Sequence, residues 1–132
     1  MRKILIIFES EDFALALRDA LLDDYDVILS NNAITGMQLL QIRPDALVLD
    51  LLLPGMDGLS FMKSIGSSRP PVVLMLTTFL SSEVLQAMSD LGVDYTIRKP
   101  CPISIVVKRL MECLSQKTPL PFGEGPIDCQ ED

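Results

Sequence analysis

Short apolar segments recur along the chain and alternate with longer segments in which apolar residues follow helical spacing. The segments at 4–8, 46–49 and 72–76 are apolar throughout, which is typical of parallel strands with both faces buried. A further apolar segment lies at 27–29 and a weaker one at 95–97. The pattern therefore predicts five strands.

Helical spacing predicts a helix after each of these strands. Asn31 or Asn32 is expected to cap the second helix, and Gly92 stands where the fourth helix needs a left-handed residue at its end. The apolar positions of the five helices are Phe13, Leu17, Ala20 and Leu21; Ile34, Met37 and Leu40; Phe61, Met62 and Ile65; Val84, Leu85, Met88 and Leu91; and Ile103, Val106, Leu110 and Leu114.

Alternating strands and helices predict an α/β fold, a doubly wound (βα)5 domain with a five-stranded parallel sheet and helices on both faces. We expect the strand order 2-1-3-4-5, in which functional groups collect outside the carboxyl ends of the strands. This domain is predicted to span residues 1–116. Pro and Gly then become frequent, so residues 117–132 are predicted to be a tail or the start of a linker.

Composition excludes several classes of function. The chain has 132 residues, 48% of them hydrophobic, which suits one domain with a sizeable core. Its net charge of −7 and the lack of Lys and Arg clusters argue against direct nucleic-acid binding. No signal peptide and no membrane-spanning segment are recognisable, so we expect a cytoplasmic protein with no membrane contact. Without any histidine, the separated Cys101, Cys113 and Cys129 argue against zinc.

Charged and hydroxyl-bearing residues follow several of the predicted strands. Asp50 ends the third strand, where a carboxylate must reach the rim, meet a partner or bind a cation. Lys99 ends the fifth strand, and Thr77 and Thr78 end the fourth, so that together they suggest an anion-handling site with its own nucleophile. With Glu9 after the first strand, Asp50 would form a two-carboxylate pocket for Mg²⁺. The alternatives are a loop-capping Asp50, an exposed Lys99, ordinary strand-end hydroxyls and a helix-start Glu9.

Three segments resemble the motifs of response-regulator receiver domains in two-component signalling. Asp50-Leu-Leu-Leu-Pro-Gly-Met-Asp-Gly is similar to their phosphorylation-site segment, and Leu76-Thr-Thr is similar to their Thr motif. Gly92-Val-Asp-Tyr-Thr-Ile-Arg-Lys-Pro resembles their Lys-Pro segment. The resemblance runs in register over residues 2–116 and implies a phosphoprotein that carries an aspartyl phosphate in a phosphorelay, with a role in transcription regulation.

The resemblance also implies a role for each matching residue. Asp50 would be the phosphoacceptor, Thr77 would bond a phosphoryl oxygen, and Lys99 would pair with the phosphoryl group. Thr78 would lie beside that group, and Pro100 would follow a cis peptide bond. Such a site works by positioning and charge neutralisation.

A metal and partners are implied in the same way. Mg²⁺ would be held by Glu9, Asp50 and the backbone carbonyl of Leu52. The phosphoryl donor would be a sensor histidine kinase, a phosphotransfer protein or a small acyl phosphate. The domain would not be an enzyme beyond catalysing its own phosphorylation and dephosphorylation. A homodimer could form through the fourth helix, fifth strand and fifth helix.

The sequence departs from the family at the metal site and at the switch region. Phe8 stands where the family has a first acid, and Glu9 replaces its second, usually an Asp, so we expect weak Mg²⁺ binding and slow phosphorylation. Thr96 occupies the position of the switch aromatic and Tyr95 lies one residue earlier, so a ring flip coupled to Thr77 is in doubt. A Tyr at this place resembles the sporulation-initiating branch of the family, in which an aromatic residue also follows it.

Two further positions concern the lifetime of the phosphoryl group. Leu52 and Phe79 are apolar where the family tunes dephosphorylation, so neither can orient a water, and we hypothesise a long-lived phospho-Asp50. A pseudo-receiver that only binds proteins is the main alternative, favoured by Phe8 and Thr96. A third hypothesis is a flavin or nucleotide enzyme on the same fold. It is opposed by the acidic segment after Phe8, where such an enzyme needs a phosphate-binding loop.

Overall fold

A computed structural model describes residues 1–78 and 80–116 of the chain. Strands and helices alternate in the predicted order. The strands are β1 (Lys3–Ile7), β2 (Asp26–Ser30), β3 (Ala46–Asp50), β4 (Val72–Thr77) and β5 (Tyr95–Arg98). The helices are α1 (Glu11–Leu21), α2 (Ala33–Leu39), α3 (Gly58–Ile65), α4 (Ser82–Asp90) and α5 (Ile103–Gln116), with short 3-10 turns at Leu40–Ile42 and Gly66–Ser68.

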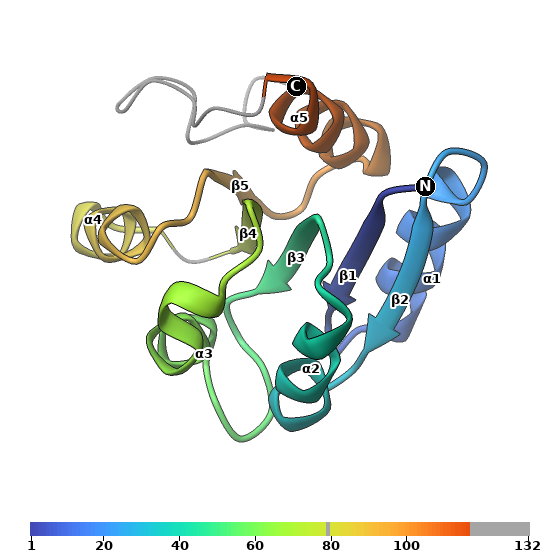
Figure 1. Ribbon diagram of the computed structural model, residues 1–132. Helices are drawn as coiled ribbons and strands as arrows, with labels where there is room; N and C mark the ends of the chain where they lie inside the picture. Colours follow the sequence, from blue (N-terminus) through green and yellow to red (C-terminus); the bar gives the residue numbers. More distant parts are fainter. Residues whose placement is uncertain (79, 117–132) are drawn as a thin grey trace.

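All five strands form one parallel sheet in the order β2-β1-β3-β4-β5, as predicted. Figure 1 shows α1 and α5 on one side of this sheet and α2, α3 and α4 on the other. Because β3 lies between β1 and β4, the carboxyl ends of these three strands meet at one rim. The expected doubly wound fold is therefore confirmed.

Each face of the sheet has its own apolar core, because successive side chains of a strand point to opposite faces. Val48 and Leu74 lie in a cluster with Leu110 of α5. Leu49 lies in a second cluster, with Phe61 of α3. The three central strands are buried along nearly their whole length, which explains why their segments carry no polar alternation.

Helix starts follow local capping chemistry. The side chains of Ser10, Asn32, Asp57 and Ser81 each accept a hydrogen bond from a backbone N–H in the first turn of α1, α2, α3 and α4. Of the two candidates for the second helix, Asn32 is the cap, and its Oδ1 lies 2.8 Å from the Thr35 nitrogen. Gly92 has a φ of 92° after α4, as its position predicted.

Some expectations at the ends of elements are wrong. β1 ends at Ile7 rather than residue 8, although Phe8 still donates a backbone hydrogen bond to the Ser30 carbonyl at 3.0 Å. Ile34, expected on an apolar face, is 71% exposed because it lies in the first turn of the short helix α2, on the side away from the sheet. Leu40 lies in the 3-10 turn after that helix.

Two other observations concern membrane-spanning helices and the state of a buried cysteine. Among residues 1–78 and 80–116, no helix is long and apolar enough to cross a membrane. Burial raises the pKa of the Cys113 thiol to about 11, so this side chain is a neutral part of the core. The predicted tail at 117–132, which includes Cys129, lies outside the described residues.

Candidate functional site

Asp50 is the last residue of β3 and is only 5% exposed. Both of its carboxylate oxygens have partners. The backbone N–H of Leu52 donates to Oδ1 at 3.3 Å, and the ammonium of Lys99 lies 3.1 Å from Oδ2. A buried carboxylate is tolerated here because an opposite charge and a backbone donor replace water.

Lys99 reaches Asp50 from the end of β5, across the end of β4. Its backbone N–H donates to the Thr77 carbonyl at 2.9 Å, which continues the pairing of β4 with β5 and fixes where the side chain starts. The peptide bond between Lys99 and Pro100 is cis, as the resemblance implied. The 3.1 Å ion pair joins residues 49 positions apart, so the fold itself creates this contact.

The two threonines after β4 differ in burial. Thr77 is 1% exposed and ends the strand between those that carry Asp50 and Lys99. Thr78 is exposed at the rim. The structure therefore brings Asp50, Thr77 and Lys99 to the ends of three adjacent strands.

Gly58 contributes to the site in a way the sequence reasoning missed. Its backbone N–H donates to the Leu51 carbonyl at 2.6 Å, which draws the loop after β3 back to the strand end. A Cβ at this position would lie 3.0 Å from the Asp50 carbonyl oxygen and 3.2 Å from the Met75 sulfur. Only glycine therefore allows this close approach. The signal was present in the sequence as the last glycine of the phosphorylation-site segment.

The end of β1 has a different character. Phe8 is 1% exposed, and its ring stacks on Phe13 of α1 with centroids 4.8 Å apart. The Lys99 ammonium lies over the Phe8 ring, 5.5 Å from its centroid. Glu9, the next residue, is exposed. The contact of Phe13 with this site was not predicted, because spacing gives the face of a helix but not the direction of a ring.

Receiver domains generally bind Mg²⁺ at an acidic site of this kind, and the residues around Asp50 fit such an ion poorly. Phe8 offers no oxygen, Asp50 already contacts an ammonium, and Glu9 is exposed. In the described part of the chain, no three His, Cys, Asp or Glu side chains cluster as a metal site. Coordination of Mg²⁺ by Glu9, Asp50 and the Leu52 carbonyl therefore stays a prediction, and we expect this binding to be weak.

Tyr95 and Thr96 lie on opposite faces of the sheet. Tyr95 is buried in the cluster under α1 and α5, where the Arg109 guanidinium lies 5.5 Å from its ring centroid. The Thr96 hydroxyl is instead 3.2 Å from the sulfur of Met88 in α4. A shift of one residue along a strand changes the face. Tyr95 therefore does not lie on the α4 side, where Thr96 stands.

The two positions expected to tune dephosphorylation have different outcomes. Leu52 is 60% exposed, although its N–H bonds Asp50, so an apolar side chain stands at the rim beside the carboxylate. Phe79 lies outside the described residues.

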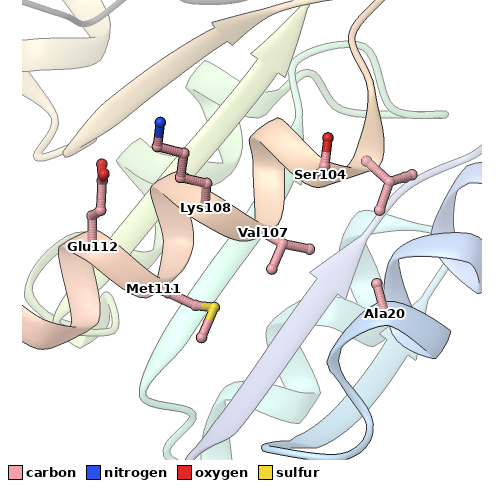
Figure 2. A pocket seen from close by; sticks show the side chains of 7 residues that line it. Ala20, Ser104, Val107, Lys108, Met111 and Glu112 are labelled. Atoms are coloured by element: carbon pink, nitrogen blue, oxygen red, sulfur yellow. The ribbon is translucent and has the colours of Figure 1, made fainter.

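A shallow apolar groove of ≈ 650 Å³ lies elsewhere, between α1 and α5. Figure 2 shows Val107 and Met111 of α5 facing it, with Ala20 of α1 on the other side. Ile105 and Val107, which fall off the main apolar stripe of α5, are both half-buried. None of the candidate site residues lines the groove, so it is separate from the Asp50 site.

The fold and the strand-end residues are those of a receiver domain of two-component signalling. The family model of the response regulator receiver domain matches residues 4–111, and the chain belongs to this family.

Several solved structures share this fold. A receiver domain protein from Methanospirillum hungatei JF-1 superimposes with a TM-score of 0.82 at 22% identity, over 89% of this chain and 96% of that one. The chemotaxis protein CheY4 of Vibrio cholerae gives 0.78 at 26% identity, over 85% and 98%. A two-component response regulator from Clostridium difficile gives 0.80 at 20%, over 88% and 98%.

Proposed function

We propose that Asp50 accepts a phosphoryl group and thereby switches a protein-binding surface of this receiver domain. The main support for this proposal is the ion pair between the Asp50 carboxylate and the Lys99 ammonium. Asp50 is a buried strand-end residue with the Lys99 ammonium 3.1 Å away, and Thr77 lies at the end of the strand between them. A nucleophile, a cation and a hydroxyl at adjacent strand ends suit acceptance of an anionic group.

The step is the transfer of a phosphoryl group from a donor to Asp50. A carboxylate oxygen of Asp50 attacks phosphorus, a new P–O bond forms, and the bond between phosphorus and the donor nitrogen or oxygen breaks with its electron pair going to the donor. Lys99 offsets the negative charge that gathers between donor and acceptor. Thr77 would bond a phosphoryl oxygen, and the rim residue Thr78 would lie beside the phosphoryl group.

The donor is proposed to be a phosphohistidine, because receiver domains generally interact with histidine kinases or phosphotransfer proteins, and this chain has no histidine of its own. The domain then acts as an acceptor that catalyses only its own phosphorylation and dephosphorylation. We place it in the cytoplasm with such a kinase. The output surface would be α4, β5 and α5, with homodimerisation or an effector in transcription regulation as its readout and no direct contact with DNA.

Mass spectrometry after incubation with a small phosphodonor tests this function. Wild-type protein should gain the mass of one phosphoryl group, and Asp50→Asn should gain none. Asp24→Asn, a change at an exposed residue outside the site, serves as the control and should be phosphorylated like the wild type. Equal mass gain in Asp50→Asn and wild type would place the acceptor elsewhere.

We further propose that phospho-Asp50 is long-lived. Leu52 is 60% exposed beside the carboxylate and has no polar group to orient an attacking water. The decay of the phosphorylated protein should take far longer than seconds, with or without a chelator. Loss of the phosphoryl group within seconds would contradict this, and Leu52→Asn should shorten the lifetime.

A pseudo-receiver that binds partners without phosphorylation is the second candidate. One observation favours it, namely that the buried Phe8 ring occupies the position of a family acid. The mass measurement separates the two functions, because a pseudo-receiver gains no phosphate under any donor or metal condition.

A further inference from the structure

The Phe8 ring lies beside the ammonium that forms an ion pair with Asp50. The Lys99 ammonium is 3.1 Å from Asp50 Oδ2 and 5.5 Å from the Phe8 ring centroid. A cation over an aromatic face within about 6 Å is attracted by the negative charge of that face, and the attraction grows when water is excluded. The Lys99 side chain is 26% exposed and that of Asp50 7%, so this contact is largely shielded from solvent.

The position of the Phe8 ring is fixed by its packing on α1 and by a backbone hydrogen bond to β2. It is 1% exposed and stacks on Phe13 with 28° between the ring planes. The backbone N–H of Phe13 donates to the Ser10 hydroxyl at 3.4 Å, at the cap of α1. A hydrogen bond from the Phe8 N–H to Ser30 fixes the backbone on the other side. The ring therefore offers a fixed face to the ammonium.

We propose that Phe8 is a positioning residue whose ring holds the Lys99 ammonium against Asp50, so that Lys99 takes the place of a divalent cation in neutralising this carboxylate. The functional part of this inference rests on the proposed role of Asp50 as acceptor. The ring replaces an oxygen ligand with a surface that attracts an ammonium and cannot coordinate a metal. A divalent ion would also have to bind next to a positive charge that already contacts Asp50, which is unfavourable.

Lysine suits this arrangement better than arginine would. Its ammonium is compact and can contact the ring face and one carboxylate oxygen at once, whereas a planar guanidinium prefers two oxygens in one plane. The ammonium lies 3.1 Å from Oδ2 of Asp50, while Oδ1 accepts the Leu52 N–H. The site is thus matched to a single point charge.

The first experiment measures the position of Lys99 in the unphosphorylated protein. Methylene protons next to the ammonium should show an upfield ring-current shift in the NMR spectrum. Phe8→Leu keeps an apolar side chain but removes the ring face, so the order of the Lys99 ammonium, measured by ¹⁵N relaxation, should fall, whereas Phe8→Tyr should keep it. Unchanged order of the Lys99 ammonium in Phe8→Leu would overturn the proposal, because a merely structural Phe8 predicts that result.

The second experiment measures Mg²⁺ affinity by titration of the metal alone. Phe8→Asp should bind Mg²⁺ at least about tenfold more tightly than the wild type, since it adds a carboxylate ligand, and Phe8→Leu should not. Phe8→Asn adds a neutral oxygen and serves if the charged variant fails to fold. Wild-type affinity equal to that of the folded oxygen-bearing variant would overturn the proposal.

Phosphorylation rates then test whether the contact of Phe8 with Lys99 replaces a metal ion in the phosphorylation of Asp50. The wild-type rate with a small phosphodonor should change less than about threefold when a chelator is added, and that of Phe8→Asp should fall by tenfold or more. A wild-type rate that falls tenfold with the chelator would overturn the proposal. Absence of any phosphate on Asp50 would instead refute the proposed function, while the NMR and Mg²⁺ measurements would still decide the role of Phe8.

Discussion

The ends of β3, β4 and β5 and the end of β1 contribute to the same rim with different chemistry. The first group supplies Asp50, Thr77 and Lys99, with a carboxylate and an ammonium 3.1 Å apart. The β1 end supplies the buried ring of Phe8 and the exposed Glu9. We call these the acceptor side and the β1 side. The two sides therefore differ in what they offer, because the acceptor side pairs a carboxylate with a monovalent cation whereas the β1 side supplies a ring and one exposed carboxylate.

Replacing Lys99 should have the largest effect, because it breaks the acceptor side at its cation. Lys99→Met should slow phosphorylation of Asp50 by about 100-fold, the usual cost of losing one charge-stabilising group. It should also lower the free energy of unfolding by about 1–3 kcal/mol, because Asp50 is left buried with only the Leu52 N–H. Mass spectrometry and urea unfolding measure the two effects. Lys63→Met, on an exposed part of α3, is the control.

Removing the Thr77 hydroxyl should have a smaller effect on the acceptor side. Thr77→Val keeps the branched shape that suits a buried strand end, so the fold should be retained. Phosphorylation should slow by about tenfold, since one neutral hydrogen bond to the transferred group is lost. Thr35→Val, an exposed change in α2, should leave the rate unaltered. An unaltered rate in Thr77→Val would mean that the acceptor side works without β4.

Gly58→Ala tests the loop that closes the acceptor side. The added methyl would lie 3.0 Å from the Asp50 carbonyl oxygen and the Leu51 Cα, so the backbone must shift. We expect a loss of about 1–3 kcal/mol in the free energy of unfolding, as for other overpacked sites, measured in urea. Ser60→Ala, an exposed change in the same helix, should stay within about 0.5 kcal/mol. Equal stability of the two variants would show that the close approach is not required.

Glu9→Gln should have the smallest effect, and it sharpens the comparison from the β1 side. An exposed single carboxylate adds little to metal affinity, so Mg²⁺ binding should weaken by less than about threefold. Titration of the metal followed by NMR gives the affinity. A loss of tenfold or more would mean that the β1 side still supplies a working metal ligand, and the contrast between the two sides would fail.

The sequence could predict what depends on regular periodicity and on strand ends. The order of elements, the parallel sheet and the approach of Lys99 to Asp50 follow from buried apolar segments and from a known topology. What it could not predict depends on exact side-chain direction. The stacking of Phe8 on Phe13 requires the rotation of α1 about its axis, and the exposure of Ile34 requires the length of α2.

The one-residue shift of the aromatic in β5 changes which part of the molecule it can influence. A strand is two-sided, so moving a ring by one position carries it through the sheet. Tyr95 packs in the core under α5 and lies beside Arg109, whereas the Thr96 hydroxyl on the other face contacts the flexible thioether of Met88 in α4. A rigid aromatic side chain of β5 therefore packs toward α5, whereas on the other face β5 contacts α4 through a flexible methionine, which adapts more easily to a shift of that helix.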